Sequence, residues 1–172
     1  KLNIEVNHAI LAKHSFEHEI AYALANDIFG SIDINRGDYL VGWDTDQFPN
    51  NTEELLLPFY YLFKNQGLGN GGLNMDAKIR RQSIDPEDLF YAHIGAMDTC
   101  ARTLLAVEKM IQDGSYEEFL QKRYENWNQN KNLMESASLE SIYEKVKLQD
   151  INPQPQSGRQ EYLENLLNSF IE

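Results

Sequence analysis

Asn3-Ile4-Glu5-Val6-Asn7-His8, near the start of the chain, is a strand-like stretch that carries a carboxylate and ends in an imidazole. Two later stretches, Ser31-Ile32-Asp33 and Asn74-Met75-Asp76, also place an acidic residue directly after a strand-like run. Helical patterns separate the three, and strands that alternate with helices are typical of parallel β/α units. We therefore predict parallel strands over residues 2–6, 30–34 and 72–75, each followed or ended by an acidic residue.

Two helices should connect these strands. Residues 16–27 repeat apolar side chains at helical spacing, as in a helix with one buried face. Asn51 and Glu54 offer a capping box for a second helix that runs to Phe63. Pro58 is a weak point of that helix, because proline removes a helical hydrogen bond. The first half of the chain is thus expected to be an α/β structure.

The second half of the chain is expected to be wholly helical. Asp85 can cap a long helix with Pro86 at its first position, and Gly114 should end it. Ser115 and Glu118 form another capping-box pattern. Shorter helices are expected near residues 139–148 and 159–171.

These patterns divide the chain into two parts. Residues 1–112 should hold the β/α units, and residues 113–172 an all-helical arm. The arm carries apolar stripes that need a surface to cover them, and we expect that surface on another subunit.

Charge and cysteine content narrow the class of protein. The chain has 172 residues and a net charge of -12, without the basic cluster that binding to nucleic acid phosphates requires. The single cysteine, Cys100, cannot form an internal disulfide and lies in an apolar helical pattern, so we expect it in the core. The sequence contains no signal peptide and no long apolar run that could span a membrane, and we expect a cytoplasmic location.

Five carboxylates and one histidine, all at or after predicted strands, could gather around metal. Glu5 and His8 are three residues apart, where a strand should give way to a loop. Asp33 and Asp76 end neighbouring strands. Asp44 and Asp46 are two apart, which on extended chain would direct both side chains to the same side. Hard oxygen ligands with one imidazole favour Mg²⁺ or Mn²⁺, with Co²⁺ as an alternative.

Each of these residues also has a plainer interpretation. Asp33 can be a turn residue, the segment of Asp44 and Asp46 a solvated loop, and His8 a core histidine. The glycines of residues 67–72 can form a phosphate cradle, although a helix-to-strand turn fits their position better. The remaining histidines, His14, His18 and His93, have no comparable setting, and we interpret His14 and His18, four apart at a helix start, as cap or surface residues.

Several stretches together resemble one family, and they occur in the same order. They are Asn3-Ile4-Glu5-Val6-Asn7-His8-Ala9, Gly30-Ser31-Ile32-Asp33-Ile34-Asn35-Arg36-Gly37-Asp38-Tyr39, Gly42-Trp43-Asp44-Thr45-Asp46-Gln47-Phe48-Pro49 and Asn74-Met75-Asp76-Ala77-Lys78-Ile79-Arg80-Arg81. Further likeness continues at His93-Ile94-Gly95-Ala96-Met97-Asp98 and Gln156-Ser157-Gly158-Arg159-Gln160-Glu161. The chain resembles the carboxyl-terminal part of D-xylose isomerase in its longer-chain bacterial and fungal class.

The resemblance implies an aldose-ketose isomerase on a (β/α)₈ TIM barrel that uses two divalent cations and no organic cofactor. Its substrate would be a pentose or hexose sugar, converted by a hydride shift from C2 to C1. Carried over by position, Glu5 resembles the carboxylate that bridges both metals, and Asp33 and Asp76 look like ligands of the substrate-binding metal. The ligands of the catalytic metal would be His8, Asp44 and Asp46.

Two further family segments do not occur in this sequence. These are Phe-His-Asp, whose histidine assists ring opening, and Glu-Pro-Lys, whose lysine contacts O1, so no catalytic residue beyond the metal ligands is assigned here. About three of the eight barrel strands are expected, too few to close a barrel. We therefore expect a fragment that is inactive alone and needs a partner for its exposed strand edge.

Three hypotheses about function remain open. In the first, the chain is a fragment of a xylose isomerase that is inactive alone. Its partner would be an amino-terminal barrel half, or another copy of the chain in a homo-oligomer. The second is a non-catalytic metal-binding or assembly module derived from a xylose isomerase. The third, a sugar epimerase or endonuclease on a related metal-using barrel, fits least well because of the match over residues 43–49 and the acidic charge.

Overall fold

The computed structural model describes residues 1–65 and 67–171. The chain divides into two compact units, and each is described by itself. The first comprises residues 1–112 with the segment from Asn168 onward, and the second comprises Asp113–Leu167. The last residue of the predicted arm, 172, lies outside the described residues.

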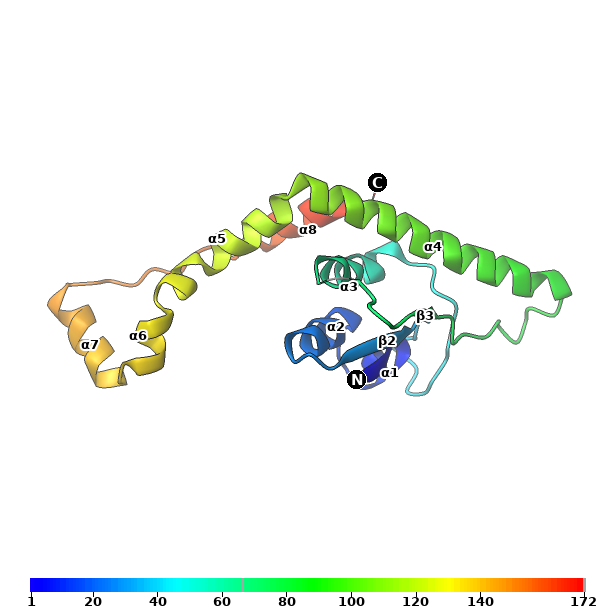
Figure 1. Cartoon of the computed structure of the whole chain (residues 1–172), viewed down its shortest axis with the longest axis horizontal. Helices are drawn as coiled ribbons and strands as arrows, with labels where there is room; N and C mark the ends of the chain where they lie inside the picture. Colours follow the sequence, from blue (N-terminus) through cyan, green and yellow to red (C-terminus); the bar gives the residue numbers. More distant parts are fainter. Residues whose placement is uncertain (66, 172) are drawn as a thin grey trace. The chain divides into compact units, whose positions relative to one another are not determined.

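Three parallel strands form the sheet of the first unit, in the order β1-β2-β3 (Figure 1). They are β1 (Leu2–Glu5), β2 (Phe29–Asp33) and β3 (Leu73–Asn74). Glu5 of β1 lies beside Asp33 of β2, and Asp33 lies beside Asn74 of β3. The three predicted strands are confirmed, and no end differs from the prediction by more than one residue. Because the strands are parallel and in this register, their carboxyl ends meet at one edge.

Helices α2 (Phe16–Ala25) and α3 (Thr52–Lys64) connect these strands and pack against each other (Figure 1). Ser15 caps α2 through its side chain, and Asn51 caps α3 by accepting a hydrogen bond from the Glu53 amide at 3.0 Å. Their apolar faces join the strands in a core of fully buried side chains, among them Val6, Ile20, Ile32, Ile34, Leu55, Leu56, Phe59 and Leu62.

Two details of α3 differ from the sequence prediction. Glu54 is not the second half of a capping box, because its carboxylate accepts a hydrogen bond from the Tyr39 hydroxyl. Pro58 does not end the helix, which continues to Lys64 with Pro58 buried. The core contacts of α3 outweigh the one hydrogen bond that proline removes.

A short helix, α1 (Val6–Leu11), follows β1 directly, where the sequence predicted a loop. Glu5 keeps extended backbone angles as the residue before this helix. Val6, Ala9 and Ile10 are buried on its inner face, so tertiary packing supports a helix too short to be stable alone. His8 lies on the exposed side of α1.

The long helix α4 (Pro86–Asp113) begins at Pro86 as predicted. Gly114 follows it with φ of 75°, in the left-handed region that glycine favours after a helix. Cys100 is buried in α4, which confirms its place in the core, and burial raises the pKa of its thiol. Among the described residues, no helix combines the length and apolar character needed to cross a membrane.

The second unit is helical. Its elements are α5 (Ser115–Gln129), α6 (Lys131–Ser136), α7 (Leu139–Leu148) and α8 (Gln160–Asn168), of which α8 ends in the first unit. Ser115 is the first residue of α5 rather than its cap, because Gly114 precedes the helix and the Ser115 hydroxyl donates to Asp113. The described residues of α7 and α8 include none that is buried, and Trp127, Leu139 and Leu148 are exposed.

Candidate metal centre

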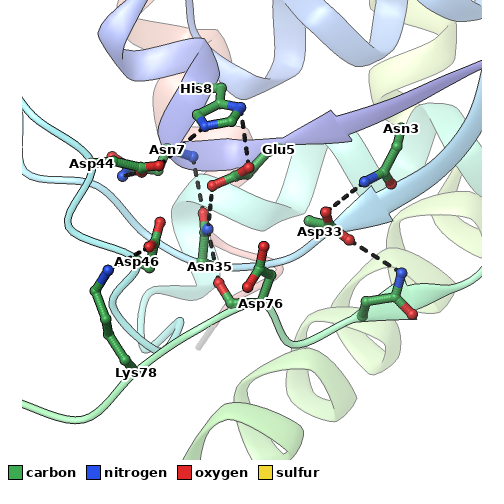
Figure 2. A network of polar contacts seen from close by, with 11 residues as sticks. Asn3, Glu5, Asn7, His8, Asp33, Asn35, Asp44, Asp46, Asp76 and Lys78 are labelled. Atoms are coloured by element: carbon green, nitrogen blue, oxygen red, sulfur yellow. Dashed lines mark hydrogen bonds and ion pairs between the residues drawn. The ribbon is translucent and has the colours of Figure 1, made fainter.

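The six candidate ligands lie around the carboxyl edge of the sheet (Figure 2). Glu5 and Asp33 are the last residues of β1 and β2, and Asp76 follows β3 by two residues. Parallel strands deliver these side chains to one edge, as in the sites of α/β barrels. The other members reach the same region from α1 and from the loop between β2 and α3.

Glu5 is the central carboxylate. Its side chain is 9% exposed, and its two oxygens have different partners. Oε1 accepts a hydrogen bond from Asn35 Nδ2 at 2.8 Å, and Oε2 lies 3.1 Å from His8 Nδ1. Burial raises the pKa of Glu5, and the negative charges of Asp44 and Asp46 raise it further, against the lowering effect of Asn35 and His8. A cation at this position would offset both the burial and the repulsion.

Two groups of ligand atoms share Glu5. In one, Glu5, His8 and Asp44 bring their donor atoms within 4.8 Å of one another. In the other, Glu5, Asp33 and Asp76 do the same. The structure thus brings five of the six predicted ligands into two clusters with one carboxylate in common.

The first cluster is held by His8 and Asp44. His8 Nε2 lies 3.1 Å from Asp44 Oδ2, so this imidazole spans between Asp44 and Glu5 (Figure 2). Asn7 Nδ2 donates to the other oxygen of Asp44. Asp44 is therefore fixed from two sides although it belongs to a loop.

In the second cluster, amides orient Asp33. Its Oδ2 accepts a hydrogen bond from Asn3 Nδ2 at 2.5 Å, and its Oδ1 accepts one from Asn74 Nδ2 at 3.1 Å. Both amides belong to neighbouring strands, and they hold the Asp33 carboxylate at the sheet edge. Asp76 is placed by its backbone, because its carbonyl accepts a hydrogen bond from Asn35 at 3.0 Å.

Asp46 belongs to neither cluster. The expectation that Asp44 and Asp46 sit on extended chain is wrong, because Asp46 has φ of 41° and the chain turns there. Its Oδ2 accepts from Lys78 Nζ at 2.7 Å, while its Oδ1 is buried without a partner among the described residues. Burial raises the pKa of Asp46, but hydrogen bonds from Lys78 and other neighbours outweigh burial and hold that pKa below its ordinary value.

Sequence reasoning missed two asparagines that organise the site. Asn35, 1% exposed, donates to Glu5 and to the Asp76 carbonyl and accepts from the Asn7 backbone amide at 2.9 Å. Asn7 is equally buried, and its Oδ1 has no partner among the described residues. Their signal in the sequence was their position, two residues after Asp33 and after Glu5.

The residues fit divalent cations. The donor atoms are carboxylate oxygens with one imidazole, the set that Mg²⁺ and Mn²⁺ accept. Asp46 Oδ1 and Asn7 Oδ1 are buried acceptors that lack a donor among the described residues, and a cation or its bound water would satisfy them.

Comparison with known proteins finds relatives over nearly the whole chain. Residues 120–171 match a family described as the XylA2 C-terminal domain. The chain is 58% identical over 174 residues to a xylose isomerase of Ruegeria sp., and 56% identical over 173 residues to that of Brucella anthropi. Each alignment covers 99% of this chain and 40% of the relative. Over nearly its whole length, the chain is similar to the carboxyl-terminal 40% of curated xylose isomerases.

The xylose isomerases that it matches are much longer, since the chain spans about 40% of their length. This similarity confirms the resemblance drawn from the strand-end motifs. The match to a carboxyl-terminal domain lies in the helical part of the chain, outside the candidate metal centre.

The other three histidines lie on the surface, as predicted for His14 and His18. His14 pairs with Glu19 Oε1 at 2.5 Å, and His18 follows the cap of α2. His93 binds the Leu89 carbonyl at 2.9 Å and contacts the Phe48 ring. None of the three belongs to a cluster of three or more potential ligands among the described residues.

Proposed function

We propose that this chain supplies the metal-binding carboxyl-terminal strands of a D-xylose isomerase, which converts D-xylose to D-xylulose on a TIM barrel. The observation that carries the proposal is Glu5, whose carboxylate is shared by two clusters of potential ligands at the sheet edge. A shared carboxylate suits two neighbouring cations, as aldose-ketose isomerisation by hydride shift requires.

In this proposal each cluster holds one divalent cation, Mg²⁺ or Mn²⁺, with Co²⁺ as an alternative. Glu5, Asp33 and Asp76 would hold the cation that binds the sugar, and Glu5, His8 and Asp44 the catalytic one. Asp46 would join the catalytic set from its place beside Asp44. When bound, the two cations would supply charge stabilisation for the sugar oxygens during the shift.

The residues of this chain prepare the site before any cation binds. Asn35 fixes Glu5 and the Asp76 segment, and Asn3 and Asn74 fix Asp33. Lys78 neutralises Asp46, which lowers the repulsion among the carboxylates. Preorganised ligands of this kind lose little freedom on binding.

The proposed barrel requires strands beyond those described here. In the described sheet, β1 and β3 each have one unpaired edge. We infer that these edges pair with the remaining strands of a longer chain, and that the 172-residue chain alone does not turn over sugar. We also infer a cytoplasmic homo-oligomer in which the exposed apolar side chains of the second unit cover another subunit.

A complementation assay tests this function. The chain alone in Mn²⁺ should not convert D-xylose, whereas the chain mixed with the amino-terminal part of the Ruegeria relative should produce D-xylulose. Glu5→Gln should abolish the restored activity, and the control Asp98→Asn, an exposed aspartate on α4, should retain it. Conversion by the chain alone would contradict the incomplete site, and a mixed complex without activity would contradict the proposed isomerase.

A second candidate is a non-catalytic metal-binding or assembly module. The exposed apolar residues of the second unit favour it, because they suit association without any role in catalysis. This alternative predicts a stable oligomer whose size is independent of sugar and of an amino-terminal partner. Native mass spectrometry in Mn²⁺ separates the two, since the isomerase requires a species that contains the second chain.

A further inference from the structure

A pocket with charged residues in its lining lies beside the metal centre and contains none of its candidate ligands. It has a volume of about 270 Å³ and is formed by the loop after β2, the segment after β3 and the first half of α4. The charged residues that line it are Arg36, Lys78, Arg80 and Asp88. Three cations against one carboxylate give the pocket a net positive charge inside an acidic protein.

The Arg36 side chain carries a buried donor without an acceptor among the described residues. Its Nε is buried and has no hydrogen-bond partner among the described residues. Burial lowers the pKa of Arg36, and the nearby positive charge of Arg80 lowers it further, while Glu54 and Asp38 act in the opposite direction. The Arg36 guanidinium therefore lies in a partly desolvated place beside a second positive charge, where an anion in the pocket would be stabilising.

Neither Arg36 nor Arg80 is neutralised by a close carboxylate among the described residues. Among the described residues, no ion pair within 4.0 Å includes Arg36 or Arg80. Lys78, in contrast, already pairs with Asp46 at 2.7 Å. Arg36 and Arg80 are therefore the two donors that remain available, and two like charges close together favour an anion between them.

The rest of the lining suits a small oxygen-rich ligand. Ser83 and Asn50 add a hydroxyl and an amide, and the ring of Phe48 adds an apolar wall. Guanidinium groups bind phosphate and carboxylate oxygens through paired N–H donors, which lysine cannot do.

We propose that this pocket binds a tetrahedral oxyanion of the phosphate class, with Arg36 and Arg80 as its charged donors. The anion offsets the repulsion between the two guanidinium groups that line the pocket. It lies next to Lys78, the residue that pairs with Asp46 of the metal centre. This site is independent of whether the metal centre supports isomerisation.

Phosphate binding to the 172-residue chain tests the proposal. Inorganic phosphate is titrated by ³¹P NMR in the presence of a chelator, at ionic strength held constant with chloride, so that neither metal nor bulk charge contributes. The expected result is saturable binding that Arg80→Gln weakens by about tenfold or more, with partial rescue in Arg80→Lys. Far-UV circular dichroism confirms that each variant is folded.

Arg81→Gln is the matched control, because Arg81 is the next residue along the chain and does not line the pocket. It removes the same charge and should leave phosphate affinity within about twofold of the unsubstituted chain, as distance and screening predict. Ser83→Ala provides a milder variant that should weaken binding without a change of charge. Absence of saturable binding, or an equal loss in Arg81→Gln, would overturn the proposal.

Discussion

Asn35 Nδ2 donates a hydrogen bond to Glu5 Oε1 at 2.8 Å, and this single amide links the ends of two strands to the site (Figure 2). The same nitrogen donates to the Asp76 carbonyl at 3.0 Å, and Asn35 Oδ1 accepts from the Asn7 backbone amide. Asn35 therefore connects segments after β1, β2 and β3. Because the side chain is buried, none of these bonds can be replaced freely by water.

Asn35→Ala should destabilise the first unit. The change leaves the Asn7 amide and one Glu5 oxygen without their partner in a buried place, at a cost of about 1–3 kcal/mol. Urea unfolding followed by circular dichroism measures this loss. Asn26→Ala is the control, because Asn26 is exposed and its side chain binds only the Tyr22 carbonyl. Equal stability of the two variants would contradict the linking role of Asn35.

The parallel sheet and most of the site were predictable from local sequence. Alternation of strand and helix patterns indicates parallel strands, whose carboxyl ends share one edge, and the acidic residue at each strand end then brings Glu5, Asp33 and Asp76 together. The structure confirms their proximity. Their roles as ligands stay a prediction.

The sequence predictions that were wrong or incomplete concern features that depend on tertiary contacts. Helix α1 replaces the predicted loop because Val6 and Ile10 are buried, and no local signal marks so short a helix. Asp46 leaves the extended path because the chain turns at its positive φ. Asn35 was not predicted as a site residue, because an asparagine two residues after Asp33 is also typical of an ordinary turn. Its role is evident only from its three hydrogen-bond partners in the structure.

Mn²⁺ titration should separate the two clusters. We expect two sites in the unsubstituted chain, and Glu5→Gln should weaken both by about tenfold or more because both clusters share Glu5. Asp33→Asn should weaken only one site. Isothermal titration calorimetry gives the number of sites and each affinity, and Asp98→Asn serves as the control for loss of a carboxylate elsewhere. A Glu5→Gln variant with two unchanged sites would refute the shared role.

The start of the sheet depends on a close approach between two glycines. A Cβ on Gly71 would lie 1.9 Å from the Gly30 carbonyl oxygen, whereas a Cβ on Gly72 would meet nothing within 4 Å. Gly71→Ala should therefore force β2 and β3 apart and cost about 1–3 kcal/mol or more, and Gly72→Ala should be nearly neutral. Thermal unfolding of the two neighbouring variants compares them directly. A similar midpoint for both would mean that the backbone relaxes without cost.

Tyr39 should titrate far above an ordinary tyrosine. Partial desolvation of its hydroxyl and the adjacent Glu54 carboxylate raise the pKa of Tyr39 to about 12, and the hydroxyl donates to Glu54 Oε1 at 3.0 Å. Because the folded state holds this proton more tightly than the unfolded state, the contribution to stability is complete below the ordinary pKa of about 10 and is lost as pH rises toward 12. The phenolate absorbance of the unsubstituted chain minus that of Tyr39→Phe isolates this residue, with circular dichroism at each pH to verify folding. In Glu54→Gln the midpoint should move down toward the ordinary value, because the repelling charge is gone. A midpoint near 10 in the unsubstituted chain would show that Tyr39 and Glu54 do not interact in solution.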